Sequence, residues 1–401
     1  MYDLVIRGGR LIDPASGLDG CFDIAVVGER IARIDRSIHA DEVGRLIDIT
    51  GKLVLPGLVD LHAHVYWGVS TDGVSSIHAP ADLVGVRSGV TTLVDAGSAG
   101  FHNLGGFVRY VVPSARTRLF AFLNVCRDGL FANTKARPGE CIDLASTIRV
   151  IEAHRTLVQG VKLILTGAIL DELGLEAVRL ASRAARESGT RLMVHIGDLR
   201  AKPNPTAAQV TREMLRMLAP GDIVTHACTA HSGGLLDVHG QVIPEAVDAK
   251  SRGVILDSAH GRTNLSFAVA RRLIDQGLVP DVISSDMTLG GRLRIVHSLL
   301  ECASKFMALG LGIGQVISMV TANPARALGL SETLGAIAPG READLTILDV
   351  VEGDWEFADS FGATLRAEKA LVPVATVRAG EVITPDWGPH PRGWLPTRSV
   401  H

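Results

Sequence analysis

The sequence predicts an α/β protein in which a (β/α)8 TIM barrel carries a small β domain built from both chain ends. Three observations lead to this fold class. Between residue 57 and about residue 286, eight short apolar runs alternate with longer helix-like segments, as in parallel βα units. This stretch has roughly the length of such a barrel. The composition is 47% hydrophobic but only 4% aromatic, and barrel interiors favour aliphatic side chains.

The expected barrel strands are almost unbroken apolar runs, which are typical of strands buried on both faces of a parallel sheet. They span residues 57–64, 90–97, 118–125, 160–167, 191–197, 222–228, 253–261 and 281–286. Amphipathic stretches between them, such as 173–189 and 205–220, predict the intervening helices. The alternative is an open doubly wound sheet, which typically has fewer strands and needs a reversal of strand order.

The two flanks of the barrel differ from it in pattern. Residues 1–55 alternate in polarity over short runs separated by turn signals, and residues after 341 repeat this style. Neither flank is large enough for a core of its own. We therefore expect residues 1–55 and 341–390 to pack together as one β domain beside the barrel at 56–340. Residues 391–401, rich in Pro and Gly, are expected to be an irregular tail.

Composition and charge exclude several classes of protein. A net charge of −3 argues against a nucleic-acid partner, which needs a basic stripe. No run reaches the length of a membrane span, and the N-terminus lacks the pattern of a signal peptide. The five cysteines are scattered without C-x-x-C spacing, which suits free thiols in the cytoplasm. We expect a cytoplasmic homo-oligomer that acts on a small molecule and has neither a nucleic-acid nor a membrane partner.

Polar residues close four of the eight apolar runs. His62 and His64 end the first run, and side chains two residues apart on a strand point to the same face. His195, His226 and Asp286 end the fifth, sixth and eighth runs. Because the carboxyl ends of barrel strands meet at one mouth, these side chains should form a ring there. Imidazole and carboxylate groups suit zinc and related divalent ions.

Each of these residues also has a purely structural interpretation. His195 and His226 could be buried histidines bonded to the backbone, and Asp286 could cap the helix that follows it. These interpretations are nearly independent, whereas one metal site explains all five residues. Lys162, within the fourth run, could pack its stem and extend its ammonium to water. If it faces the site instead, it must be neutralised or modified, because a cation is unfavourable among metal ligands.

Taken together, these residues resemble the amidohydrolase superfamily over essentially the whole chain. The matching segments are PGLVDLHAH (56–64), VKL (161–163), VHIG (194–197), VTHA (224–227), SSD (284–286) and TANPARALGL followed by GAIAPGREADLTILD (321–349). The last of these resembles the family's passage from barrel to small β-sandwich. The nearest likeness is to the amidohydrolase/deacetylase metallohydrolases, which are related to dihydroorotases and D-aminoacylases. The segments KLIL, LMVHIG, DSAHG and SSDM carry that likeness.

The resemblance implies a binuclear site, usually of zinc. His62 and His64 would bind the more buried ion, and His195 and His226 the second. Lys162 would be carboxylated on its side-chain nitrogen and bridge both ions, which turns an unfavourable cation into an anion. A hydroxide bridging the two ions would then attack the carbonyl of an ester or amide (acyl) bond. Asp286, a further ligand, would accept the hydroxide proton and deliver it to the leaving group.

The sequence leaves the substrate contacts and the substrate open. His260 ends the seventh run and could contact the substrate or be a loop residue. Arg262 could pair with a substrate carboxylate, and Tyr66 could line the pocket wall. A cyclic amide hydrolase of dihydroorotase or hydantoinase type would use the same ligands. A mononuclear deaminase would lack the lysine at position 162, and a non-catalytic binding barrel is expected to have lost ligands.

Overall fold

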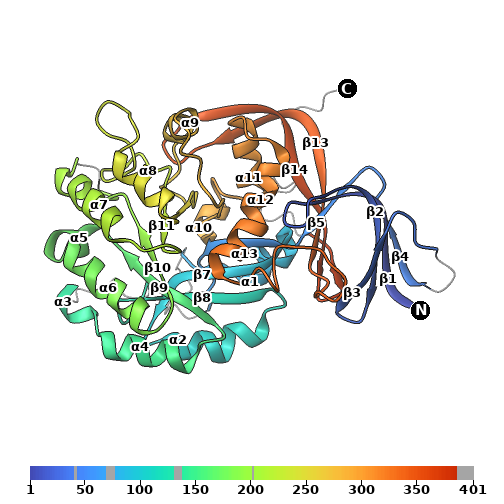
Figure 1. Cartoon of the computed structure of the whole chain (residues 1–401), viewed down its shortest axis with the longest axis horizontal. Helices are drawn as coiled ribbons and strands as arrows, with labels where there is room; N and C mark the ends of the chain where they lie inside the picture. Colours follow the sequence, from blue (N-terminus) through green and yellow to red (C-terminus); the bar gives the residue numbers. More distant parts are fainter. Residues whose placement is uncertain (40–42, 69–76, 131–137, 201–202, 386–401) are drawn as a thin grey trace.

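The computed structural model describes residues 1–39, 43–68, 77–130, 138–200 and 203–385 (Figure 1). The expected tail at 391–401 lies outside these ranges. The described chain forms a parallel sheet surrounded by helices and a second, mixed sheet at one end. None of the described helices is both long and apolar enough to span a membrane.

The parallel sheet contains seven strands in chain order, each hydrogen-bonded to the next. They are β6 (Leu58–Ala63), β7 (Val90–Gly100), β8 (Arg118–Asn124), β9 (Val158–Ile164), β10 (Arg191–His195), β11 (Ile223–Thr225) and β12 (Ile255–Asp257). Each lies within or overlaps one of the first seven expected runs. β6 and β7 are buried along their whole length, which explains why they read as unbroken apolar runs.

The eighth expected run does not form a regular strand. It joins the two edges of the sheet through isolated parallel bridges, Asp257 with Val282 on one side and Ala63 with Met287 on the other. The amide of Asp286 also donates to the carbonyl of His62 at 2.7 Å. The sheet therefore curls until residues 282–287 connect its first strand to its last.

Helices follow most strands and cover the outside of this sheet (Figure 1). The α6 helix, Leu175–Glu187, buries a row of small side chains that includes Ala177, Ala181 and Ala184, which allows close packing. The other main helices are α4 (Leu144–Ala153), α7 (Pro205–Met217), α8 (Pro244–Ser251), α9 (Phe267–Asp275), α11 (Leu299–Ala308) and α12 (Ile313–Val320). Shorter ones are α1 (Ala81–Val84), α2 (Leu104–Gly106), α3 (Pro138–Cys141), α5 (Gly167–Glu172), α10 (Leu289–Arg292) and α13 (Ala322–Leu328), with η1 (Val86–Ser88), η2 (Phe107–Val111) and η3 (Val112–Ser114).

The second sheet joins both ends of the chain. From the N-terminal end come β1 (Tyr2–Asp13), β2 (Leu18–Val27), β3 (Arg30–Asp35), β4 (Val43–Asp48) and β5 (Leu53–Pro56), and from the C-terminal end β13 (Leu345–Ala358), β14 (Thr364–Arg378) and β15 (Glu381–Ile383). The short β5 strand links the two groups, since it pairs with β1 in parallel and with β13 antiparallel. The eight strands thus form one continuous hydrogen-bonded sheet rather than two separately bonded ones.

The β13–β14 hairpin is longer than the sequence pattern predicts and leaves the small sheet. In Figure 1 its two strands arch over the parallel sheet, and their turn lies near α9. Trp355, Phe357 and Leu371 of this far half belong to the same hydrophobic core as the parallel sheet. The turn at residues 359–363 is thereby held against the end of the sheet where the histidines lie.

Candidate active site

The histidine pair and Asp286 are aligned by backbone pairing at the end of β6. Asp286 donates its amide to the His62 carbonyl, and His64 donates its amide to the Met287 carbonyl at 2.9 Å. This pairing brings one carboxylate oxygen, Asp286 Oδ1, within 3.4 Å of His62 Nε2 and 3.0 Å of His64 Nε2. All three residues are buried.

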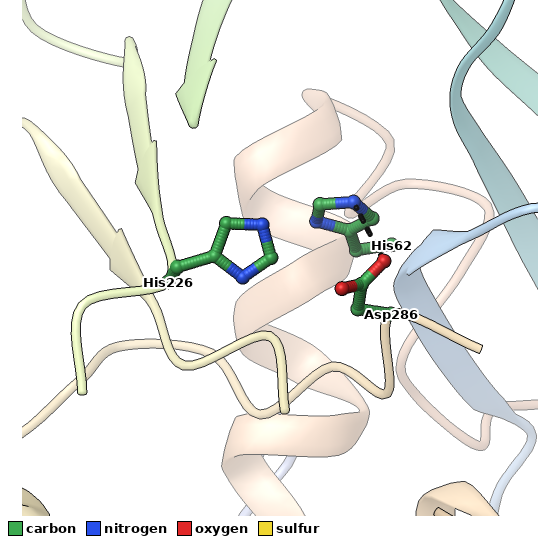
Figure 2. Close-up of side chains that lie close together, drawn as sticks. All are labelled: His62, His226 and Asp286. Carbon is green, nitrogen blue, oxygen red and sulfur yellow. Dashed lines mark ion pairs between the residues drawn. The ribbon is translucent and has the colours of Figure 1, made fainter. Parts of the chain in front are cut away.

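His62, His226 and Asp286 point toward one another from three elements (Figure 2). One ligand atom from each lies within 4.8 Å of the others. His226 and Asp286 have left-handed backbones, with φ of 68° and 48°. Such strain costs about 1–3 kcal/mol per residue outside glycine and tends to persist where function requires it. The geometry suits a shared metal ion.

His195, the last residue of β10, completes this cluster. Its ring lies 4.0 Å from that of His226, measured between centroids. Its Nε2 atom is buried and has no hydrogen-bond partner among the described residues. A buried nitrogen with no partner is rare in a folded protein and calls for a specific explanation. An imidazole nitrogen is a common ligand of divalent metals, so the unpartnered atom fits a metal ion.

Lys162 faces the same cluster from β9. It is 1% exposed, so the interpretation in which its ammonium reaches water is wrong. Its Nζ lies 3.4 Å from His62 Nε2 and 3.3 Å from Met193 Sδ. Burial lowers the pKa of Lys162 to about 7 despite nearby carboxylates that raise it. Gly97, at φ 88°, makes room for the stem, because a Cβ there would lie 2.7 Å from Lys162 Cγ.

The second ring nitrogen of three of the histidines is held by a neighbour. His226 Nδ1 donates to the Ala259 carbonyl at 2.9 Å, since a carbonyl can only accept. Thr225 donates its hydroxyl to Asp257 at 2.8 Å and therefore accepts from His62 Nδ1 at 2.9 Å. In both rings the Nε2 atom is left without a proton, and its lone pair points into the cluster. Metal-binding histidines adopt this arrangement.

Similarly, His64 Nδ1 lies 3.0 Å from the hydroxyl of Ser98. Sequence analysis did not identify Ser98, Thr225 or Asp257. Thr225 and Asp257 end β11 and β12, so a search of every strand end for polar residues would have found these two.

Burial and neighbouring charged or polar groups together set the protonation states of the cluster. Burial lowers the pKa of His226 to about 4 and lowers the pKa values of His62 and His195 well below the usual range, so that the imidazoles are neutral. Burial also acts to raise the pKa of Asp286, but the hydrogen bond from His64 and the nearby His226 and Lys162 hold it below its usual value. Neutral imidazoles and an ionised carboxylate are the forms that bind metals.

A cavity of about 180 Å³ opens above these residues. Its lining includes five of the six predicted ligands, His62, His64, Lys162, His195 and Asp286, with His226 directly behind them. Aliphatic side chains such as Ile164 and Leu199 form part of its wall, and Arg262, Thr263 and Asn264 form another part. Asn264 donates from Nδ2 to Asp286 Oδ2 at 3.4 Å, a contact that sequence analysis did not anticipate.

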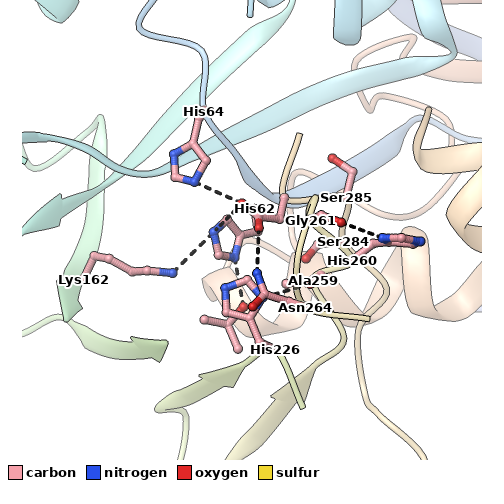
Figure 3. Close-up of polar contacts among 12 residues, drawn as sticks. His62, His64, Lys162, His226, Ala259, His260, Gly261, Asn264, Ser284 and Ser285 are labelled. Carbon is pink, nitrogen blue, oxygen red and sulfur yellow. Dashed lines mark hydrogen bonds and ion pairs between the residues drawn. The ribbon is translucent and has the colours of Figure 1, made fainter. Parts of the chain in front are cut away.

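Of the three predicted substrate contacts, only Arg262 lines this cavity. The His260 ring points away from the cluster (Figure 3), and its nitrogens bond to the Gly261 carbonyl and to Lys305 Nζ, both at 2.8 Å. Tyr66 is buried and donates its hydroxyl to the Asn103 carbonyl. His260 and Tyr66, predicted to contact the substrate, therefore do not line this cavity, and each side chain bonds to other partners.

The chain is similar to known proteins in sequence and in structure. The sequence model of the amidohydrolase family matches residues 53–383. A deacetylase of Brucella anthropi is 33% identical over 357 residues, which cover 88% of this chain and 85% of the relative. Two crystal structures are also similar over 96% of this chain and all of their own. One is of an adenine deaminase, with a TM-score of 0.85 and 26% identity, and the other is of a dihydroorotase, with a TM-score of 0.83 and 29% identity.

Proposed function

The chain belongs to the amidohydrolase family and is a hydrolase, and we propose that it cleaves an ester or amide (acyl) bond of a small molecule at two divalent metal ions. The observation that carries this proposal is the convergence of His62, His226 and Asp286 beside the unpartnered Nε2 of His195. We also propose that β6–β12 and residues 282–287 are the eight strands of a (β/α)8 barrel, with these residues at its mouth.

The donor set fits a binuclear site. His62, His64, His195, His226 and Asp286 would hold the ions, with zinc the metal that such nitrogen and oxygen donors suit. Divalent ions held there would make a water molecule acidic near neutral pH and polarise the carbonyl of the substrate.

We propose that Lys162 is carboxylated and acts as the shared ligand. A neutral amine can add carbon dioxide: the nitrogen–carbon bond forms, the nitrogen loses a proton, and the product is an anion. Burial brings the pKa of Lys162 to about 7, so a large fraction of this amine is neutral at physiological pH. The modification removes the electrostatic conflict between an ammonium group and metal ions.

Asp286 is suited to move the proton during hydrolysis. Its carboxylate is ionised at neutral pH and accepts a hydrogen bond from Asn264. It would take a proton from the attacking water and give it to the oxygen or nitrogen that leaves. The reaction consumes one water, breaks the acyl bond, and yields a carboxylic acid and an alcohol or amine.

Arg262 indicates the class of substrate. Its side chain is exposed at the cavity and forms no hydrogen bond or ion pair with the described residues. A guanidinium group binds a carboxylate through two parallel hydrogen bonds. We therefore propose a small acylated amino acid or hydroxy acid, whose free carboxylate pairs with Arg262 while its acyl group reaches the metal ions.

A cyclic amide hydrolase is the second candidate, favoured by the similarity to a dihydroorotase structure. The test is a hydrolysis panel of N-acyl amino acids, acylated hydroxy acids and cyclic ureides on zinc-loaded protein. Asp286→Asn serves as the inactive control. Turnover of the acylated acids supports the proposal, and turnover of cyclic ureides alone would replace it with the second candidate. No turnover of any compound would refute both.

A further inference from the structure

The part of the cavity wall that carries Arg262 is a loop rather than a strand. The β12–α9 loop, residues 258–266, places Arg262, Thr263 and Asn264 at the cavity. Gly261 in the same loop packs against Asp286, because a Cβ there would lie 2.1 Å from Asp286 Oδ2. The close contact at Gly261 limits how near the loop can come to the carboxylate.

The turn of the β13–β14 hairpin, residues 359–363, holds this loop from outside. Ser360 donates its amide to the Leu265 carbonyl at 2.9 Å. Its hydroxyl accepts from the Leu265 amide at 3.3 Å and donates to the Gly261 carbonyl at 3.1 Å. Ser360 thus bonds to the loop on both sides of Arg262, through residues about 100 positions earlier in the chain.

Asp359 fixes the turn and the start of α9 together. It is 2% exposed, and its Oδ2 accepts from the Phe267 amide at 2.9 Å. Its Oδ1 accepts from the amides of Phe361 and Ala363, both at 2.8 Å. The carboxylate therefore sets the conformation of the turn and links it to the helix that follows the loop.

His231 provides a third contact between the hairpin turn and the β12–α9 loop. His231 Nε2 donates to the Thr263 carbonyl at 3.0 Å, and the His231 ring lies 5.1 Å from the ring of Phe361. The loop is thus bonded at Gly261, Thr263 and Leu265, and each bond leads to the hairpin turn directly or through one side chain.

We propose that Ser360 and Asp359 are positioning residues that set substrate affinity by holding the β12–α9 loop, and Arg262 with it. This inference rests on the proposed function, in which Arg262 binds a substrate carboxylate. A loop without such support samples many conformations. The affinity of a binding group on that loop falls in proportion to the fraction of time that the loop spends in the binding conformation. The hairpin of the C-terminal segment would then be part of the substrate site without contacting the substrate.

The test compares Ser360→Ala with Thr364→Ala, an exposed threonine on the same hairpin, for which the structure gives no side-chain hydrogen bond. Loss of two hydrogen bonds should raise KM for the acylated acid about tenfold, with kcat changed far less. Ser360→Thr, which keeps the hydroxyl, should restore KM. In an Arg262→Ala background Ser360→Ala should have no further effect on KM, because the two residues act through one contact.

An unchanged KM in Ser360→Ala, or an equal effect in the Arg262→Ala background, would overturn the inference. If the wild-type protein hydrolyses none of the compounds, the proposed function is refuted. The positioning role of Ser360 and Asp359 is then tested by amide hydrogen exchange. Faster exchange of the 258–267 amides in Ser360→Ala and in Asp359→Asn, but not in Thr364→Ala, would support the positioning role. Unchanged exchange in these two variants would refute it.

Discussion

The substitution Thr225→Val tests whether the contacts behind the histidines prepare them to bind metal. The two side chains have nearly the same shape, and Thr225 is fully buried, so the change removes a hydroxyl without opening a cavity. That hydroxyl is the link between His62 Nδ1 and Asp257 Oδ2. Both groups lose a partner in the variant.

The magnitude follows from these contacts. A buried polar group left without a partner costs about 1–3 kcal/mol. His62 Nδ1 and Asp257 Oδ2 already lie 3.7 Å apart, so a small movement can pair them directly and recover part of that cost. Asp257 also keeps the hydrogen bond from Ser284 at 2.6 Å. We therefore expect the metal-free variant to lose about 2 kcal/mol of unfolding free energy.

Metal affinity should fall further than stability alone suggests. Loss of the group that orients a metal-binding histidine typically costs about 10–100-fold in affinity. Zinc titration against a competing chelator measures this quantity, and urea denaturation of the metal-free protein measures stability. The matched control is Thr376→Val, since Thr376 is equally buried and its hydroxyl has no partner among the described residues. Equal zinc affinity in the two variants would refute the reasoning.

Three further predictions concern the charged groups of the site. Asp286→Asn should keep its bound metal but lose about 10²–10⁴-fold in kcat, and near wild-type turnover would show that this residue does not move the proton. Lys162→Ala should bind fewer than two zinc ions per chain by elemental analysis, whereas a full complement would exclude Lys162 as the shared ligand. Burial raises the pKa of Asp60 to about 7, so the folded metal-free protein keeps a proton that the unfolded chain releases near pH 4. Its stability should therefore fall as the pH rises from about 4 to 7, and the slope in urea titrations should be smaller for Asp60→Asn.

The sequence was informative where one strand end fixed both the position and the direction of a side chain. His195 ends β10, His226 directly follows β11 and His62 is the second-last residue of β6, and the three rings converge. Lys162 lies inside β9, so the sequence alone could not decide whether it faces the site or solvent. Its direction depends on how the parallel sheet curls and on the space that Gly97 leaves.

The direction of the His260 side chain has a local physical cause. β12 ends at Asp257, and Ala259 then adopts a left-handed backbone with φ 34°. In a longer strand the side chains would continue to alternate between the two faces of the sheet. The turn at Ala259 ends this alternation and directs His260 toward Lys305 of α11. Ser360 was missed for another reason, because its contact with Gly261 spans about 100 residues and depends on a hairpin that leaves its own sheet.

The balance of buried charge explains why this arrangement should bind cations rather than merely tolerate them. Burial raises the pKa of Asp60 to about 7 and of Asp257 to about 6, and it raises that of Asp95 as well. The same burial lowers the pKa of Lys162 to about 7, so the protein's own cation is only partly charged. Without metal ions, little positive charge therefore lies next to the ionised Asp286. Ionising the three buried acids as well is unfavourable for the same reason. Divalent ions would supply positive charge at the point where the neutral imidazoles converge, so the buried acids that are costly to ionise would favour metal binding.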